Sequence, residues 1–119
     1  MSLKILVVED DVVFCRLLTK FLNNNRIETR DAQSAARARE LLALEKFDVV
    51  ITDYKLPDED GLSVLEATKN SPNSNSTKLL MSRFRDEEVV ARARELGVVD
   101  FIQKPIKPAE FLELLEKLG

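Results

Sequence analysis

Three acidic residues directly follow two strongly apolar segments of the chain. Glu9 and Asp10 come after "KILVV" at 4–8, and Asp53 comes after "DVVIT" at 48–52. If these segments are neighbouring parallel strands, their carboxyl ends meet at one edge of a sheet, where folds of this kind bind ligands. Two unit charges 4 Å apart repel by about 4 kcal/mol at an effective dielectric near 20, so such a cluster requires a cation. Carboxylate oxygens, with no histidine or cysteine beside them, favour Mg²⁺.

Two further polar residues are expected at the same edge. Ser82 ends the apolar segment "KLLMS", and Lys104 closely follows "VVDFI". A lysine ammonium and a hydroxyl beside a metal-bound carboxylate can hold the oxygens of a phosphoryl group. Asp53 would then be the nucleophile that becomes an aspartyl phosphate. Each residue alone has a simpler explanation, because acids after strands often cap helices, as Asp11 is expected to do, and Lys104 could be an exposed loop lysine.

The expected elements place these residues in an α/β fold. Five apolar segments alternate with five helical patterns, which predicts a parallel sheet with helices on both faces. The expected strands are 4–8, 27–32, 48–52, 78–82 and 98–102. The second, "IETRDA", is polar enough to be an edge strand. Three of the expected helices are 34–46, 62–70 and 86–96, and Gly97 is expected to end the last of them in a left-handed conformation.

The first and last helices are expected to contribute apolar stripes to the core. The helical spacing of these residues indicates packing rather than a cofactor site. The stripes comprise Phe14, Leu17, Leu18, Phe21 and Leu22, and then Phe111, Leu114, Leu115 and Leu118. The single cysteine, Cys15, is also expected in the core, as a small apolar side chain without a redox role.

Composition excludes several classes of function. A chain of 119 residues that is 45% hydrophobic fits one domain. Its formal charge of −3 and pI near 5.1 do not favour direct nucleic-acid binding. The absence of histidine excludes histidine acid–base chemistry, histidine metal ligands and a phosphohistidine carrier. No apolar segment is long enough to span a membrane, and a lone cysteine indicates a reducing compartment, so a cytoplasmic location is expected.

Over residues 1–119 the motifs resemble the receiver (CheY-like) domain of bacterial two-component response regulators. The resemblance rests on "ILVVED", on "DYKLPDEDG" around Asp53, on Ser82 after "KLLM", and on "DFIQKP" with Lys104. It implies a flavodoxin-like, doubly wound sheet of five parallel strands in the order 2-1-3-4-5. It also implies that Asp53 accepts a phosphoryl group from a phosphohistidine on a sensor kinase or a phosphotransfer protein.

The resemblance further implies a role for each site residue. Asp10 and Asp53 would bind Mg²⁺ directly, Glu9 would bind it through water, and Lys55 would bind it through its backbone carbonyl. Ser82 and Lys104 would hold phosphate oxygens, and the Lys104–Pro105 peptide would be cis. Phe101 matches the family's aromatic switch position, although it could also be an ordinary core residue. Arg83 stands where the family usually has a small residue; it could shield the phosphate, bind it, or point into solvent.

The resulting hypothesis is a phosphorylation-controlled signalling switch. The domain would catalyse its own phosphorylation and dephosphorylation at Asp53 without being a stand-alone enzyme. Its output face, formed by the fourth helix, fifth strand and fifth helix, would bind a downstream protein or a fused output domain. Positive charges in this region are Arg85, Arg92, Arg94 and Lys107, which could suit an acidic partner or simply be solvated.

Two alternatives belong to other classes. A scaffold receiver that works without phosphorylation would be expected to lack some site residue, yet all of them are present. A small Mg²⁺-dependent phosphohydrolase would need an acid two residues beyond its aspartyl nucleophile, where this chain has Lys55. The sequence therefore favours the receiver.

Overall fold

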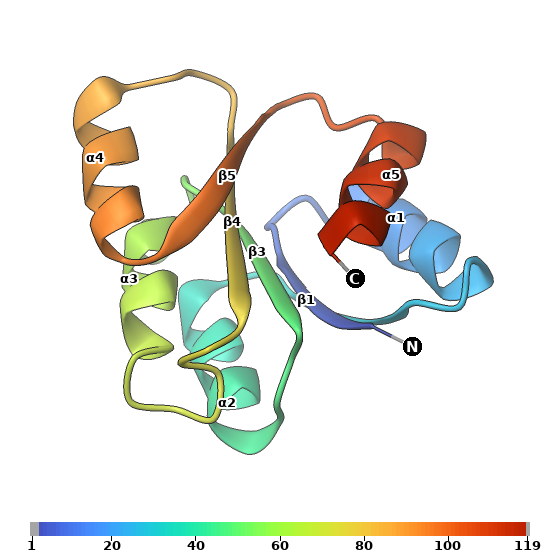
Figure 1. Cartoon of the computed structure of the whole chain (residues 1–119), viewed down its shortest axis with the longest axis horizontal. Helices are drawn as coiled ribbons and strands as arrows, with labels where there is room; N and C mark the ends of the chain where they lie inside the picture. The colour runs from blue at the N-terminus through green and yellow to red at the C-terminus, as the bar shows by residue number, and fades with distance from the viewer. Residues whose placement is uncertain (1–2, 119) are drawn as a thin grey trace.

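The computed structural model describes residues 3–118 and contains the expected alternation of strands and helices (Figure 1). Its elements are β1 (Lys4–Val8), α1 (Val12–Asn24), β2 (Glu28–Ala32), α2 (Ala35–Leu44), β3 (Val49–Asp53), α3 (Gly61–Ala67), β4 (Thr77–Ser82), α4 (Glu87–Glu95), β5 (Val98–Gln103) and α5 (Pro108–Leu118). Within these described residues, no helix is both long and apolar enough to cross a bilayer.

The five strands form one parallel sheet in the order β2-β1-β3-β4-β5, which confirms the expected topology. Every residue of β3 is buried, and so are four of the five in β1, because helices cover both faces of the central strands. In β2, exposed and buried residues alternate for most of its length, as expected of an edge strand.

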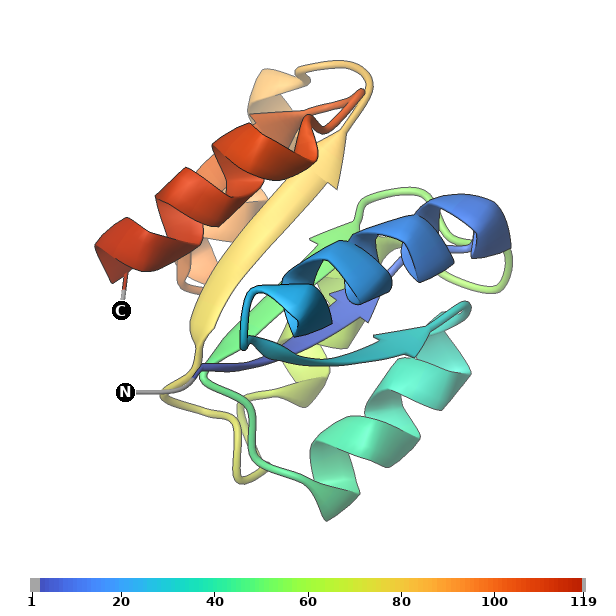
Figure 2. The same cartoon turned by 90° about the vertical axis from the view of Figure 1, so that its right-hand side faces the viewer.

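The helices lie in two layers. Two helices, α1 and α5, lie side by side on one face of the sheet, and α2, α3 and α4 cover the other (Figures 1 and 2). Cys15 and Leu115 pack with Ile51 on the first face, so Cys15 is a core residue as expected. Leu6 and Val50 face α2 on the opposite side. Alternate residues of each central strand thus belong to different core clusters, as the period of two requires.

Two residues of the expected apolar stripes are exposed instead. Leu17 is 64% exposed and Leu118 is 39% exposed, so their assignment to the core was wrong. At 100° per residue, Leu17 lies 100° away from the buried Leu18 around α1 and falls outside the face that contacts the sheet. Leu118 lies in the last turn of α5, beyond the buried Leu115.

Helix ends differ modestly from the expectation. The third helix stops at Ala67 rather than residue 70, because the backbone N–H and the hydroxyl of Thr68 both bond to the Leu65 carbonyl and tighten the last turn. Gly97 ends α4 with a φ of +95°, as expected. Asp11 caps α1 by accepting a hydrogen bond of 3.0 Å from the Phe14 N–H, also as expected.

Close packing around Gly61 fixes where α3 starts relative to β3. A Cβ atom on Gly61 would lie 2.2 Å from the backbone oxygen of Asp53, which is far inside van der Waals contact. The Gly61 N–H also donates to the Tyr54 carbonyl at 2.6 Å. Only glycine lets the helix approach the end of β3 this closely.

Gly61→Ala is therefore expected to lower the free energy of unfolding by roughly 2 kcal/mol or more, because the clashing atom belongs to the backbone and cannot rotate away. Denaturant titration measures the change. Glu66→Ala, an exposed substitution in the same helix, is the control and should change stability by less than about 0.5 kcal/mol. Wild-type stability for Gly61→Ala would contradict this packing.

Candidate phosphoryl and metal site

The carboxyl ends of β1 and β3 bring the three acids together. Val8 pairs with Thr52 in the parallel ladder, so Glu9 and Asp53 leave neighbouring strands at the same level. Carboxylate oxygens of Glu9, Asp10 and Asp53 all lie within 4.8 Å of one another. Glu9 and Asp53 are buried, whereas Asp10 is exposed. The cluster expected from the sequence is present.

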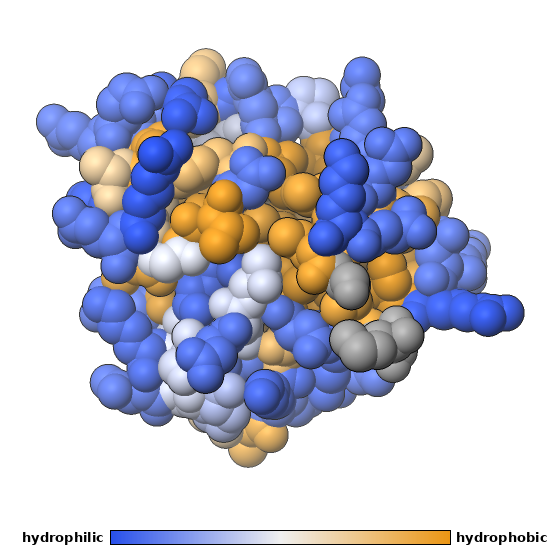
Figure 3. Space-filling model, viewed as in Figure 1, coloured by the Kyte–Doolittle hydropathy of each residue, from blue (hydrophilic) through white to orange (hydrophobic). Residues whose placement is uncertain are grey.

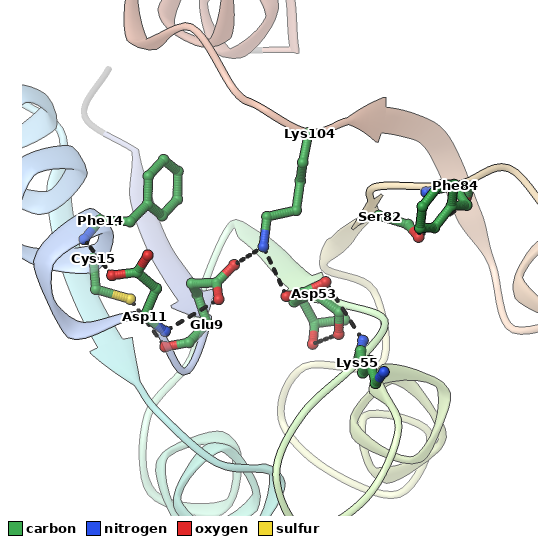
Figure 4. A network of polar contacts seen from close by, with 10 residues as sticks. Glu9, Asp11, Phe14, Cys15, Asp53, Lys55, Ser82, Phe84 and Lys104 are labelled. Carbon is green, nitrogen blue, oxygen red and sulfur yellow. Dashed lines mark hydrogen bonds and ion pairs between the residues drawn. The ribbon is translucent and has the colours of Figure 1, made fainter.

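Lys104 joins two of these acids. Its Nζ lies 2.6 Å from Glu9 Oε2 and 2.9 Å from Asp53 Oδ2 (Figure 4). One ammonium therefore compensates two carboxylates that would otherwise repel each other in a buried setting. The alternative, that Lys104 is merely an exposed loop lysine, does not hold, because the side chain of Lys104 is only 17% exposed.

The end of β5 aims Lys104 at the acids. The Lys104 N–H donates to the Ser82 carbonyl at 2.8 Å, which continues the pairing of β4 and β5 beyond Gln103. The Lys104–Pro105 peptide is cis, as the resemblance implied. The ammonium thus reaches across the end of β4 to Asp53 at the end of β3.

Glu9 is held by its neighbours from several directions. Its N–H donates to the Ala32 carbonyl at 2.9 Å, and its carbonyl accepts a bond of 3.2 Å from the Cys15 thiol. Its Oε1 accepts a bond of 3.1 Å from the Asp11 N–H. Backbone and side chain are therefore both fixed, which orients Oε2 toward Lys104.

Burial and pairing shift the protonation of this cluster. Burial raises the pKa of Glu9 to about 7, even though the hydrogen bond from Lys104 opposes the shift. Burial alone would lower the pKa of Lys104, but its hydrogen bonds to Glu9 and Asp53 outweigh that effect and raise it. Burial also raises the pKa of Cys15 to about 12, so this thiol stays protonated and unreactive.

Ser82 lines the same cavity, but its hydroxyl bonds the backbone of Phe84 and not the acids. The cavity has a volume of about 780 Å³, and the acids, Lys104, Ser82 and Arg83 are among the residues that line it. The hydroxyl of Ser82 donates to the Phe84 carbonyl at 2.9 Å (Figure 4). Ser82 therefore lies at the expected edge of the sheet, but its hydroxyl is hydrogen-bonded to the loop that follows β4.

The residues present fit a hard divalent cation. The acids offer only carboxylate oxygens, and the one thiol nearby is directed at a carbonyl. Such a donor set suits Mg²⁺, which uses one or two carboxylates and retains waters. Lys55 lies beside this set, since its N–H approaches Asp53 Oδ1 at 3.4 Å. Glu9, Asp10, Asp53 and the Lys55 carbonyl are the groups that would hold the ion.

Phe101 lies next to a second cavity, between β4 and α4. This cavity of about 150 Å³ is lined by apolar residues, among them Leu80, Val89 and Phe101, and also by polar ones such as Arg85. Phe101 is half-buried, so it is neither a simple core residue nor a freely exposed one. The guanidinium carbons of Arg85 and Arg94 each lie 5.7 Å from its ring centre, within the range of cation–π attraction.

The structure adds residues that the sequence analysis did not single out. Phe84, 83% exposed, lines both cavities and stands at the rim of the acidic one. Tyr54, Leu56 and Pro57 line the acidic cavity from the β3–α3 loop. In the sequence, Phe84 is marked only by being an aromatic residue two positions after Ser82. That pattern does not predict that its side chain is exposed at the cavity.

Fold and pocket together define a flavodoxin-like α/β domain with an acidic ligand site at the carboxyl edge of its sheet. The family model for the response regulator receiver domain matches residues 5–116. The chain therefore belongs to this family, whose members act in two-component signal transduction.

Individual relatives agree with this assignment. The chain is 30% identical to response regulator protein PilR of Pseudomonas aeruginosa, over 94% of this chain and 25% of PilR. It is 35% identical to protein PetR of Rhodobacter capsulatus, over 91% of this chain and 45% of PetR. It thus spans less than half the length of both. A CheY-like receiver domain protein from Methanospirillum hungatei superposes with a TM-score of 0.89 at 28% identity, over 99% of this chain and 94% of that structure.

The buried Glu9 predicts a pH dependence of stability in metal-free protein. The folded protein holds the Glu9 proton up to about pH 7, whereas an unconstrained glutamate releases it near 4.5. The folded state then binds more protons than the unfolded chain in this window, so stability falls as pH rises from about 4.5 to 7, by roughly 2 to 3 kcal/mol. The chain has no histidine, and no other side chain normally titrates between pH 5 and 8.

Denaturant titrations with EDTA at a series of pH values measure this slope. Glu9→Gln has no proton to exchange, so its stability should be nearly flat over the same window. If the stability of wild type and of Glu9→Gln changed equally with pH, Glu9 would have an ordinary pKa and the prediction would be wrong.

Proposed function

We propose that this receiver domain is a signalling switch that accepts a phosphoryl group on Asp53 from a phosphohistidine of a sensor kinase or phosphotransfer protein. The observation that carries the proposal is the position of Lys104 Nζ, 2.9 Å from Asp53 Oδ2 and 2.6 Å from Glu9 Oε2, within the acidic cavity. A carboxylate nucleophile and a cation that can hold transferred oxygens are thus in contact.

Each residue has a defined task in the transfer. An Asp53 carboxylate oxygen attacks phosphorus, the bond from phosphorus to the donor's imidazole nitrogen breaks, and the imidazole leaves with the electron pair and takes up a proton. Lys104 remains protonated and compensates negative charge on the phosphoryl oxygens. Mg²⁺, when bound at Glu9, Asp10, Asp53 and the Lys55 carbonyl, would neutralise further charge on those oxygens.

In the proposed mechanism, Ser82 carries the change to the surface. A phosphoryl group on Asp53 offers a charged acceptor for the Ser82 hydroxyl, which otherwise bonds the Phe84 carbonyl at 2.9 Å. Exchange of that bond frees the β4–α4 loop and allows Phe101 to turn into the adjacent 150 Å³ cavity. For an almost complete switch, phosphorylation must favour the active state by about 5.5 kcal/mol.

The partner surface we infer is formed by α4, β5 and α5. Apolar residues gather over the middle of this face between charged side chains (Figure 3), and Val99 on β5 is 62% exposed. The positively charged side chains here are exposed, namely Arg85, Arg92, Arg94 and Lys107. This face would bind a downstream protein or a fused output domain, in the cytoplasm, where a lone Cys15 stays reduced.

Phosphorylation should depend on Mg²⁺ and occur only at Asp53. Incubation with a small phosphodonor and Mg²⁺ should add the mass of one phosphoryl group to the wild-type chain, as measured by intact mass spectrometry. Asp53→Asn should show no increment, because an amide is a poor nucleophile, and Asp48→Asn, which changes an exposed acid before β3 at the end of the strand away from the site, is the control that should still be labelled. Equal labelling of wild type and Asp53→Asn would refute the acceptor, and an unlabelled wild type would favour the scaffold.

Arg83 should lengthen the lifetime of the aspartyl phosphate. It is exposed, lines the acidic cavity beside Ser82, and can cover the path by which water attacks the phosphoryl group. Charge-assisted hydrogen bonds to the phosphate would further stabilise the ground state and slow hydrolysis. Arg83→Ala should shorten the half-life several-fold and leave Mg²⁺ affinity nearly unchanged.

The half-life is measured as loss of the phosphoryl mass after the donor is removed. Arg92→Ala, an exposed arginine substitution on α4, is the control and should have no effect. An unchanged half-life for Arg83→Ala would mean that Arg83 points into solvent, and a longer one would mean that it assists hydrolysis.

A further inference from the structure

The β3–α3 loop is attached to the N-terminus of α2 by a side chain that phosphoryl chemistry does not use. Asp58 Oδ1 accepts a hydrogen bond of 2.9 Å from the Ala35 N–H, and Oδ2 accepts one of 3.0 Å from the Ala36 N–H. The first N–H groups of an α-helix have no partners within the helix. Asp58 supplies those partners from a loop 23 residues further along the chain.

This contact is additional to the usual cap of α2. Ser34 already occupies the N-cap position, where its hydroxyl accepts a bond of 3.1 Å from the Arg37 N–H. The hydrogen bonds from Ala35 and then Ala36 lower the pKa of Asp58, so its carboxylate is ionised at neutral pH. Two oxygens of one carboxylate therefore bind two adjacent amides, which restrains the orientation of the side chain as well as its position.

Other contacts hold the same loop against α2. Leu56 is buried in a cluster with Ala35 and Ala38 of α2. Glu59 Oε2 lies 2.6 Å from Nη2 of Arg39, also on α2. At the base of the loop, Lys55 and Asp60 form an antiparallel bridge that closes it. The loop thus has one side facing the acidic cavity and the other side fastened to α2.

We propose that Asp58 is a positioning residue for the acidic site: by tying the β3–α3 loop to α2, it keeps the Lys55 backbone in place to bind a divalent cation. The inference rests on the proposed function, since it assigns the Lys55 carbonyl to the metal. Asp58 itself contacts neither the ion nor the phosphoryl group in this scheme. Lys55 is three residues away from Asp58 and joined to Asp53 through its N–H, so restraint of the loop restrains both groups.

The physical reason is conformational entropy. Loop residues that are free to sample several backbone conformations must be ordered when the cation binds, and that cost reduces affinity. Because Asp58 already orders the loop when the protein folds, less conformational entropy is lost when the cation binds. Removal of Asp58 should therefore weaken cation binding without removing any ligand of the cation.

Asp58→Ala tests this, with Ser34→Ala as the matched control. Both substitutions remove a side-chain acceptor from the N-terminus of α2, but only the first releases the loop. Tyr54 is the only tyrosine, the chain has no tryptophan, and Tyr54 adjoins Asp53, so tyrosine fluorescence reports Mg²⁺ titrations. Amide hydrogen exchange of residues 54–60 in metal-free protein reports the loop itself.

Asp58→Ala should weaken Mg²⁺ binding several-fold and speed amide exchange in residues 54–60, while Ser34→Ala changes neither. Asp58→Asn keeps one acceptor oxygen and should lie between wild type and Asp58→Ala. Wild-type Mg²⁺ affinity in Asp58→Ala, or an equal loss in Ser34→Ala, would overturn the inference. Phosphoryl uptake by the wild type is measured separately. If the wild type binds Mg²⁺ but takes up no phosphoryl group, the proposed function is wrong. The Mg²⁺ titration still decides the role of Asp58 in that case.

Discussion

The ion pairs of Lys104 with Glu9 and Asp53 are the interactions on which the site depends. Both carboxylates are buried, and bringing two like charges into a buried setting costs free energy through repulsion and lost hydration. A single ammonium within 2.9 Å of both offsets part of these costs, and burial still raises the pKa of Glu9 to about 7. In the proposed function the same ammonium would also hold phosphoryl oxygens, so one group would stabilise both the resting pocket and the phosphorylated one.

The strand order makes this contact geometrically available. Glu9 directly follows β1 and Asp53 ends the adjacent β3, whereas Lys104 follows β5, which is separated from β3 by β4. The lysine reaches Asp53 because its backbone stays paired with Ser82 at the end of β4 and its long side chain spans that strand. The same five strands in another order would separate these groups.

The two loops beside the pocket are attached to the rest of the domain in different ways. Asp58 and Glu59 fasten the β3–α3 loop to α2. The β4–α4 loop instead carries the exposed Phe84 and is joined to the sheet through the Ser82 hydroxyl and the Gln103 amide. In the proposed function, a new acceptor for Ser82 would therefore change the β4–α4 loop more readily than the β3–α3 loop, and the β4–α4 loop leads to α4.

The sequence by itself determined the strands, their order through the family resemblance, the acids at two strand ends, and local caps such as Asp11 and Gly97. Apart from the strand order, these features depend on hydrophobic period and on contacts within a few residues, which a linear pattern records. Only the tertiary structure decided that Ser82 bonds the Phe84 carbonyl, that Leu17 faces outward, and that Lys104 bridges Glu9 across 95 residues. Those outcomes depend on which surfaces the packed elements leave exposed and on distances between segments remote in the chain, and no local pattern encodes either.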